Sequence, residues 1–456
     1  MSKKILLVSA NTYTSPYPVY PLGVSYLKTN LRQVLPEFEV SVYDLNFGGI
    51  VSLEEVLRTG EFRYVGVSLR NIDDNNLYAK NSFIRGYREV TDCIRAHSKA
   101  CVILGGAGFS IFPDILLQCL EADFGIQGEG ESTLAELLRT LEAGENPSHI
   151  EGLVFRDTNG EIKVNSRERY AESLTLHFEE NWLDYYWNGS GMLNVQTKRG
   201  CPHKCIYCSY PVIEGRKVRS LDPLEVVETL KELYFGKHIN YVFFTDSVFN
   251  IDRNYNEELA RRIIESGVKV GWGAYFSPRN LSREDLQLYK QAGLTHIEFG
   301  TESFSDQQLE NYRKGFHWAD VVEKSHFCDD LGIFYAHFLI LAGYGETEAS
   351  LEETFRHSRE LTNAVIFPYI GMRIYPDTEL FRIALREGRI ASREELLNPV
   401  YYVAEGVDLT TLQARAKATG ARWIFPGEGS EELMARFRAK KRRGPLWEYL
   451  RFGGEG

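Results

Sequence analysis

Three cysteines crowd into the stretch KRGCPHKCIYCSYP, residues 198–211, near the middle of the chain. Cys201, Cys205 and Cys208 have the spacing C-x3-C-x2-C. Zinc sites usually take four ligands in two separated pairs, and the sequence offers no second pair. A [4Fe-4S] cluster held by three thiolates fits better, because one iron then stays open for a further ligand. The spacing therefore predicts an iron–sulfur cluster, with chance clustering on a loop as the alternative.

The segments after these cysteines predict the elements of a partial (β/α)6 barrel, because short apolar runs alternate with amphipathic ones. We expect strands at 240–247, 271–277, 296–303, 334–343 and 367–376, and helices at 220–234, 256–267, 282–293, 317–332 and 351–362. Barrel sites lie at the carboxyl ends of the strands. Polar residues gather there, and those expected to contact a cofactor are Asp246, Ser247, Ser277, Glu302 and Arg373. For Ser277 and Glu302 the alternative is a capping role at the next helix.

The first 150 or so residues predict a doubly wound parallel α/β sheet, similar to a Rossmann fold. Apolar, β-branched runs lie at 3–10, 38–45, 64–69, 100–106 and 122–128, and amphipathic segments at 22–35, 79–97, 112–121 and 131–144 fit the gaps between them. Ligands of such sheets bind beyond the carboxyl ends of the strands. We therefore expect a second site at that edge.

Glycine and polar residues follow the third, fourth and fifth of these strands. Glycine lets a backbone approach a flat or phosphate-bearing ligand, and Glu129 can accept hydrogen bonds from hydroxyl or amide groups. No GxGxxG sequence follows the first strand, so a nicotinamide dinucleotide is disfavoured. The residues predicted to bind a cofactor here are Ser68, Arg70, Asn71, Gly105, Gly106, Ala107, Gly128 and Glu129.

The C-x3-C-x2-C spacing is also the signature of the radical S-adenosylmethionine superfamily. About 140 N-terminal residues resemble the cobalamin-binding domain of such enzymes, which has YPLG after the first strand and GG and GEGE stretches after the fourth and fifth. The resemblance implies that the open iron chelates S-adenosylmethionine and that Tyr207 packs near its adenine. It further implies that Asp246 and Ser247 face the methionine amine and Glu302 the ribose or methionyl group.

One departure from that family concerns the lower face of the cobalamin. Many cobalamin domains have an Asp-x-His-x-x-Gly sequence whose histidine ligates cobalt, and this chain has none. Arg70 is our candidate for that position, because a permanent cation cannot ligate cobalt. The alternative is that Arg70 pairs with Asp73 or Asp74 and orders the loop. We take Arg70 and Tyr207 as the candidate catalytic residues.

The sequence suggests four regions. They are a cobalamin-binding-like domain (1–148), a hairpin and linker (149–190), the barrel (191–395) and a C-terminal extension (396–456). The hairpin is expected around Asn159-Gly160. Aromatic residues of the linker could pack between the domains or shield a site. The basic, aromatic end ARFRAKKRRGPLWEYLRFGG could be a solvated helix face, a lid, or a surface for an anionic lipid or an acidic electron donor.

Charge and composition exclude several classes of protein. The formal net charge is −11, from 52 Lys and Arg against 63 Asp and Glu, so nucleic acid is disfavoured as the main partner. No stretch approaches the roughly 20 apolar residues of a membrane-spanning helix. The apolar N-terminus lacks the cleavage site of a signal peptide, and we expect a cytosolic protein. Outside the cluster, Cys93, Cys101, Cys119 and Cys328 are expected to be buried, reduced thiols.

These observations favour a cobalamin-dependent radical S-adenosylmethionine methyltransferase that acts on a carbon of a small molecule, natural product or lipid. A flavodoxin, ferredoxin or reductase would supply electrons. The alternative is a radical enzyme for ring formation or carbon–carbon coupling whose N-terminal domain binds no cobalamin. A methylthiotransferase is disfavoured, because its second cluster needs a cysteine trio in the N-terminal domain. A non-catalytic iron–sulfur sensor would not need the polar strand ends.

Overall fold

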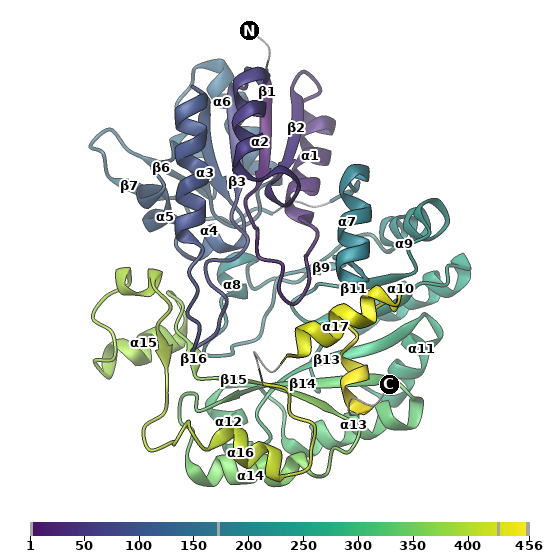
Figure 1. The fold of residues 1–456 in the computed structure, drawn as a ribbon. Coiled ribbons are helices and arrows are strands. Elements are labelled where there is room, and N and C mark those ends of the chain that lie inside the picture. Colours follow the sequence, from purple (N-terminus) through teal and green to yellow (C-terminus); the bar gives the residue numbers. More distant parts are fainter. Residues whose placement is uncertain (1–2, 171–173, 426–428, 453–456) are drawn as a thin grey trace.

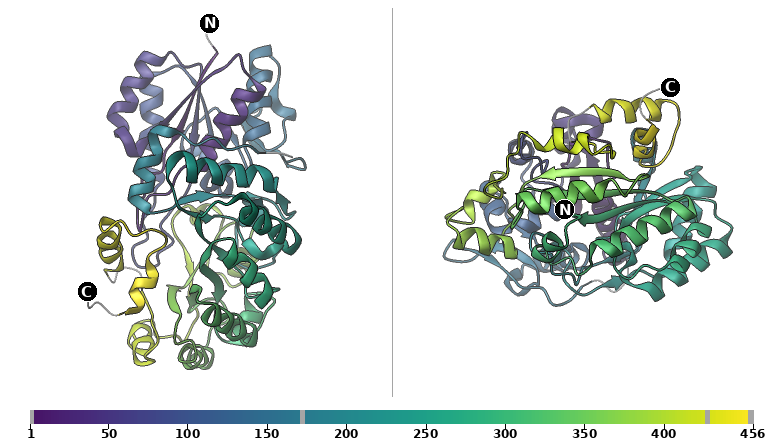
Figure 2. Two further views of the ribbon diagram at one scale, coloured as in Figure 1. Left: turned by 90° about the vertical axis from the view of Figure 1, so that its right-hand side faces the viewer. Right: turned by 90° about the horizontal axis from the view of Figure 1, so that it is seen from below.

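Two sheets, a mixed N-terminal sheet and a parallel barrel sheet, lie one above the other in the computed structural model of the protein (Figure 1). The structure describes residues 3–170, 174–425 and 429–452. The N-terminal sheet lies above, the barrel lies below, and Figure 2 shows the same stacking from the side. The predicted fold class, a Rossmann-like sheet followed by a partial barrel and a small extension, is confirmed.

The N-terminal sheet has the strand order β2-β1-β3-β4-β5-β6-β7. Its parallel strands are β1 (Lys4–Ser9), β2 (Glu39–Asp44), β3 (Tyr64–Ser68), β4 (Cys101–Gly105) and β5 (Phe124–Ile126). Its helices are α1 (Leu22–Val34), α2 (Leu45–Gly60), α3 (Ile84–His97), α4 (Ala107–Ile111), α5 (Pro113–Cys119) and α6 (Glu131–Ala143). All five predicted strands are present, whereas the sequence prediction missed α2.

Helices cover both faces of this sheet, which explains why its strands are apolar throughout. Along β1, Ile5 and Leu7 face a core shared with α1 and α6, whereas Leu6 and Val8 face a core shared with α2 and α3. The expected helix 79–97 begins only at Ile84. The residues before it form a loop, because the Asn81 carbonyl oxygen accepts a hydrogen bond from the Asp74 N–H at 3.1 Å and the Phe83 N–H donates to the Ile72 carbonyl oxygen at 2.9 Å.

The predicted hairpin around Asn159-Gly160 extends the same sheet. Strands β6 (Leu153–Arg156) and β7 (Ile162–Val164) are antiparallel, and β6 pairs with β5. Helix α7 (Glu180–Ser190) then carries the aromatic linker residues to the barrel, and Trp182 and Tyr186 are buried. The packing interpretation of these aromatic residues therefore fits the structure. The exact domain boundaries stay a prediction.

The barrel is a six-stranded parallel sheet with the order β15-β14-β13-β12-β11-β8. Its strands are β8 (Leu193–Val195), β11 (Tyr241–Phe244), β12 (Gly271–Phe276), β13 (Leu294–Glu302), β14 (Phe334–Leu341) and β15 (Val365–Ile370). Its helices are α8 (Tyr210–Ile213), α9 (Pro223–Lys231), α10 (Arg253–Ser266), α11 (Arg283–Gln291), α12 (Asp306–Asn311), α13 (Trp318–Leu331), α14 (Glu348–Ser358) and α15 (Glu379–Arg386). The short first strand, β8, was missed by the sequence prediction.

The expected last strand, 367–376, is divided in the structure. Gly371 has φ of +69°, a conformation that favours glycine, and the chain turns there. Beyond it β16 (Met372–Arg373) leaves the barrel and pairs with β17 (Tyr401–Tyr402). A second small ribbon, β9 (Lys198–Arg199) with β10 (Arg219–Ser220), brackets the cysteine loop.

Two loops connect the N-terminal sheet to the barrel. The loops after β1 and β3 descend from the N-terminal sheet to the barrel (Figure 1), and Asp73 of the second loop pairs with Arg373 at 2.9 Å.

The C-terminal extension comprises α16 (Leu412–Ala418), α17 (Ser430–Ala439) and a final 3-10 turn (Trp447–Phe452). Trp447 of that turn is buried, whereas Arg436, Lys440 and Arg442 are exposed, so the basic segment combines a solvated helix face with a packed turn. The last residues of the predicted basic segment, 453–454, lie outside the described residues.

Helix length and cysteine burial were compared with two smaller predictions. Within the described residues, no helix has the length and apolar character needed to cross a membrane. None of the seven cysteines, all of which lie in the described residues, forms a disulfide. Cys93 and Cys328 are buried, but Cys101 and Cys119 are only half-buried, since each lies near the surface end of its element.

Candidate functional site

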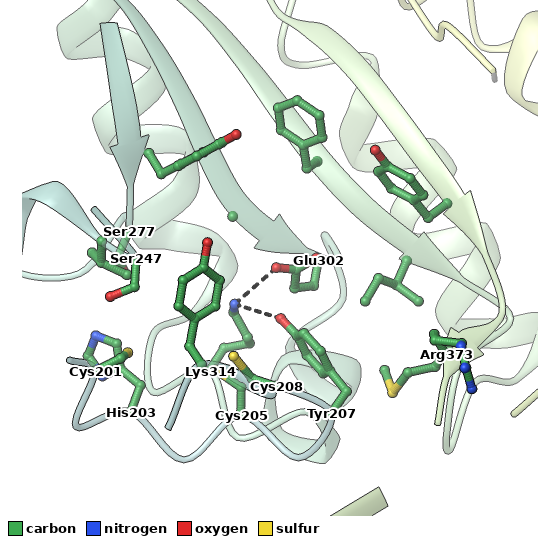
Figure 3. Close-up of a pocket in the computed structure, with 18 of the residues that line it drawn as sticks. Cys201, His203, Cys205, Tyr207, Cys208, Ser247, Ser277, Glu302, Lys314 and Arg373 are labelled. Carbon is green, nitrogen blue, oxygen red and sulfur yellow. Dashed lines mark hydrogen bonds and ion pairs between the residues drawn. The ribbon is translucent and has the colours of Figure 1, made fainter. Parts of the chain in front are cut away.

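The cysteine loop forms one wall of a cavity of about 420 Å³ at the carboxyl ends of the barrel strands. Cys201, Cys205 and Cys208 all line it (Figure 3). The loop can begin so tightly only because of Gly200, which has φ of +89°. A Cβ atom there would lie 2.1 Å from the carbonyl oxygen of Lys217, so any other residue would force the loop open.

The three thiols suit a multi-iron cluster better than a single ion. Among the described residues, no three His, Cys, Asp or Glu side chains are grouped as a mononuclear metal site would require. Each thiolate of a cubane binds a different iron, so the sulfur atoms stand farther apart than around one ion. Burial raises the pKa of Cys208 to about 12 and also raises that of Cys201. Thiols in such surroundings ionise when a cluster supplies positive charge.

A buried lysine that sequence reasoning missed lies beside the cluster loop. The Nζ atom of Lys314 lies 3.3 Å from the Glu302 carboxylate and 3.3 Å from the Tyr207 hydroxyl (Figure 3). Lys314 follows α12 and belongs to no recognisable motif, so no signal in the sequence marked it. It brings positive charge to a wall that would otherwise consist of thiols, a carboxylate and a phenol.

Glu302 and Tyr207 lie where the sequence predicted, on the wall of the cluster cavity. Glu302 has φ of +70°, at an irregularity in the pairing of β13 with β14. A residue with a side chain rarely adopts this conformation, which costs of order 1–3 kcal/mol and is typical of functional sites. The strain turns the carboxylate toward Lys314 and the cavity.

The two predicted serines also line this cavity, but Asp246 does not. Ser247 and Ser277 belong to the lining, whereas Asp246 is 1 % exposed and lines neither of the cavities described here. Its carboxylate accepts hydrogen bonds from the Thr197 backbone at 2.7 Å and the Lys198 backbone at 3.0 Å, and it pairs with the Lys198 ammonium group. The prediction that Asp246 contacts the methionine amine is therefore corrected. Its bonds join β8 and β9 to β11.

Arg373 also borders the cluster cavity, and protein groups accept four of the five N–H groups of its guanidinium. It pairs with Asp73 and donates to the backbone carbonyl oxygens of Leu396, Ile374 and Val400 at 2.7, 2.8 and 3.3 Å. These bonds connect the two domains and, among the described residues, leave one N–H of Nη2 without a protein acceptor. The contact of Arg373 with a cofactor therefore stays a prediction.

A second cavity, of about 380 Å³, lies between the carboxyl edge of the N-terminal sheet and the barrel. Most of the predicted residues line it: Ser68, Arg70, Gly105, Gly106, Ala107, Gly128 and Glu129. Gly106 has φ of +97°, and a Cβ atom there would lie 2.6 Å from the carbonyl oxygen of Leu69. Asn71 is not part of the lining, because its backbone carbonyl accepts a hydrogen bond from Tyr87 and the chain turns away.

Arg70 lines this second cavity, and its positive charge has no partner among the described residues. Asp73 pairs with Arg373, and Asp74 accepts a hydrogen bond from Asn81 at 2.7 Å, so neither acid holds Arg70. Within the described residues no hydrogen bond or ion pair reaches the Arg70 guanidinium. Burial lowers its pKa, yet a guanidinium remains charged in proteins. A charged group that lacks a protein partner is suited to face a ligand.

The carboxylate of Glu129, by contrast, binds mainly protein groups. It forms ion pairs with Arg219 and, at 3.7 Å, with Arg199, while Arg199 also pairs with Glu131 at 2.9 Å. These contacts fasten the end of β5 to the ribbon beside the cysteine loop. One Glu129 oxygen, Oε2, is buried and makes no hydrogen bond, so it could still accept one from a ligand.

Tyr210 and Tyr275 line both cavities and so form the wall between them. Each is 38 % exposed although protein surrounds it closely enough to raise its pKa strongly by burial. The exposed area of these rings therefore belongs to the cavity walls. Sequence reasoning missed both, although Tyr210 lies two residues after the last cysteine.

Comparison with known proteins agrees with this arrangement. Residues 195–357 match the model of the Radical SAM superfamily, and residues 8–138 match that of the B12 binding domain. The chain is 23% identical to an uncharacterised methyltransferase of Pyrococcus horikoshii, over 82% of each chain. It is 24% identical to tryptophan 2-C-methyltransferase of Streptomyces laurentii, over 79% of this chain and 71% of the relative.

A solved structure matches the whole fold. The radical S-adenosylmethionine methyltransferase TsrM of Kitasatospora setae, with tryptophan substrate and an S-adenosylmethionine analogue bound, superposes with a TM-score of 0.89. The match covers 99% of this chain and 97% of that one at 21% identity. Fold and site together define a radical S-adenosylmethionine protein with an N-terminal B12-binding domain.

The chain thus carries a radical S-adenosylmethionine domain and a cobalamin-binding domain, as its sequence predicted. The cluster cavity is lined mainly by the radical S-adenosylmethionine domain, whereas both matched domains line the second cavity. The residues that contact each cofactor stay predictions.

Proposed function

We propose that this protein is a cobalamin-dependent radical S-adenosylmethionine methyltransferase that methylates a carbon of a small molecule. The observation that carries the proposal is the pair of adjoining cavities, which share Tyr210 and Tyr275 as a wall. A group bound in one cavity would meet a group bound in the other across these two rings. The similarity to methyltransferases supports methyl transfer as the reaction class.

The residues of the cluster cavity fit an iron–sulfur cluster and S-adenosylmethionine. Cys201, Cys205 and Cys208 would hold three irons, while Lys314 and Glu302 would orient the bound S-adenosylmethionine. When bound, the cluster supplies an open iron and an electron for sulfonium cleavage, and cobalamin supplies a cobalt that carries a methyl group. Aromatic side chains around the site exclude water from it.

The second cavity fits a corrin ring at the edge of the N-terminal sheet. Its glycines leave room for a flat ligand, and the hydrogen-bonding capacity of Glu129 Oε2 is unused. Arg70 would lie near the lower face of the ring and, as a cation, would disfavour a ligand there. The alternative of an N-terminal domain that binds no cobalamin gains no support from this cavity or from the matched B12 domain.

Anaerobic reconstitution tests the proposal. Protein reconstituted with iron, sulfide and hydroxocobalamin is expected to retain a corrinoid spectrum after desalting, and to release the labelled methyl group of S-adenosylmethionine to a small-molecule acceptor. Cys205→Ala should abolish methyl release and the cluster spectrum but keep the corrinoid. Cys119→Ala, a half-buried cysteine outside both cavities, is the matched control. Loss of the corrinoid from the wild-type protein would contradict the proposal.

A flavodoxin, ferredoxin or reductase as electron donor, and a cytosolic location, remain predictions. The reconstituted protein should catalyse repeated turnover only when an electron donor is present. Flavodoxin with its reductase is the first donor to test.

A further inference from the structure

A buried carboxylate, Glu298, lies beneath the floor of the cluster cavity. It belongs to β13, where side chains alternate between the two faces. Ile297 and Phe299 pack outward in the core shared with the barrel helices. Glu298 therefore points inward, on the same face as Gly300, which lines the cavity about 7 Å farther along the strand.

The path between Glu298 and the cavity is not blocked at Gly300. A Cβ atom built there would meet only the Glu302 carboxylate within 4 Å, at 3.4 Å. Glu298 pairs in register with Tyr275 of the neighbouring strand, whose ring is a wall of the cavity. The absence of a side chain at position 300 thus leaves the space above the carboxylate open.

The carboxylate has one hydrogen bond among the described residues. The indole Nε1 of Trp447 donates to Glu298 Oε1 at 2.9 Å, from the C-terminal turn that closes the far end of the barrel. No ion pair to Glu298 is present in the described parts of the chain, although the side chain is only 5 % exposed. An ionised carboxylate in such a position is costly unless something pairs with it.

Aromatic rings surround the space into which Glu298 faces. Tyr275 of β12, Phe338 of β14 and Tyr369 of β15 line the cavity from both sides of β13. Tyr369 is 37 % exposed even though burial raises its pKa to about 12, so its free surface also borders the cavity. Aromatic faces attract cations as well as flat rings.

We propose that Glu298 binds a basic nitrogen of the substrate, and that the methyl acceptor is a small aromatic or apolar molecule carrying an ammonium group. This inference rests on the proposed methyltransferase function and names its substrate class. The ammonium group would lie against the Glu298 carboxylate, with the rest of the molecule between Tyr275, Phe338 and Tyr369. The carbon to be methylated would then point up toward the wall shared with the second cavity.

A cation suits this position better than a neutral donor for two reasons. Burial raises the pKa of Glu298 to about 7, because the ionised carboxylate loses its contact with water. The Coulomb attraction of an adjacent cation would offset this cost of ionisation. The other charged residues of the cavity wall already have ion-pair partners, since Lys314 pairs with Glu302 and Arg373 pairs with Asp73. A substrate with an ammonium group would therefore be oriented in one direction only.

Three probes of similar shape test the charge: tryptamine (cation), 3-ethylindole (neutral) and indole-3-propionate (anion). Equilibrium dialysis is done with protein reconstituted with cluster, hydroxocobalamin and S-adenosylmethionine, without a reductant. Tryptamine is expected to bind at least tenfold more tightly than 3-ethylindole, and indole-3-propionate more weakly than either. This comparison uses the wild-type protein and does not depend on how a variant folds.

Glu298→Gln keeps the acceptor for Trp447 but removes the charge. It should lower tryptamine affinity about tenfold and leave 3-ethylindole affinity unchanged. Glu346→Gln, at another buried carboxylate that lines neither cavity, should change neither affinity. Equal affinity for tryptamine and 3-ethylindole, binding of no probe, or an unchanged preference in Glu298→Gln would overturn the inference. The corrinoid and methyl-transfer assays do not depend on these results, so this inference can be wrong while the proposed function is right.

Discussion

The ion pair between Asp73 and Arg373 should contribute strongly to the stability of the two-domain arrangement. Both side chains are 2 % exposed, and their contact at 2.9 Å joins the loop after β3 to β16. Asp73→Asn keeps the size of the side chain and the acceptor for the Asn75 backbone, so it removes chiefly the charge. Arg373 would then be a buried cation whose remaining bonds go to three backbone carbonyl oxygens.

Breaking a buried pair by removing one partner costs about 3–5 kcal/mol, because the other charge stays buried and uncompensated. Because Arg373 keeps its bonds to three carbonyl oxygens, we expect Asp73→Asn to lower the free energy of unfolding by about 3 kcal/mol, near the lower end of this range. Urea unfolding followed by circular dichroism measures the loss of unfolding free energy. Limited proteolysis of the loop 69–83 should also become faster, since the loop loses its anchor on the barrel.

The neighbouring Asp74 supplies the matched control. It is half-buried and its carboxylate bonds to Asn81 and the Asn76 backbone, without a cation. Asp74→Asn should cost no more than about 0.5 kcal/mol, the usual range for surface positions. If Asp73→Asn and Asp74→Asn destabilise the protein equally, the buried pair does not hold the domains as reasoned here.

Three further predictions concern the site and its surroundings. Gly200→Ala should prevent assembly of the cluster, because its Cβ would lie 2.1 Å from a backbone oxygen; iron and sulfide content per chain after reconstitution measures this. Lys314→Gln should leave iron content unchanged and weaken S-adenosylmethionine binding about tenfold in equilibrium dialysis, because Glu302 loses its counter-charge; unchanged affinity would refute the positioning role. Burial raises the pKa of Glu346 from 4.5 to about 7, so the native state binds the extra proton between these values and stability should fall by about 2–3 kcal/mol as pH rises from 4.5 to 7. In urea titrations Glu346→Gln should remove that part of the pH dependence, and an identical pH profile in the variant would contradict it.

Much of the fold could be predicted because local patterns encode it. Apolar, β-branched runs marked all five parallel strands of the N-terminal sheet, and the spacing of three cysteines marked the cluster loop. β8 was missed since it has only three residues, Leu193–Val195, too few to show a period. The helix α2 was missed because glycine interrupts it, with φ of +62° at Gly49.

The parts of the site that escaped prediction depend on contacts between distant residues. Asp246 has the residue type of a ligand, but its bonds to Thr197 and Lys198 appear only when β8 and β11 lie side by side. The partner of Arg373 is 300 positions away in the sequence. Glu298 looks like any charged residue in a strand until Trp447 closes the barrel beneath it. Sequence spacing contains no information on such pairs.

The wall formed by Tyr210 and Tyr275 has a thermodynamic consequence. A ligand that presses against one side of these rings changes the shape and the free energy of the space on the other side. By linkage, each ligand must then alter the affinity of the other by the same factor. Measured dissociation constants for the two sites should depend on each other, and a value obtained with one cavity empty should differ from that of the loaded protein.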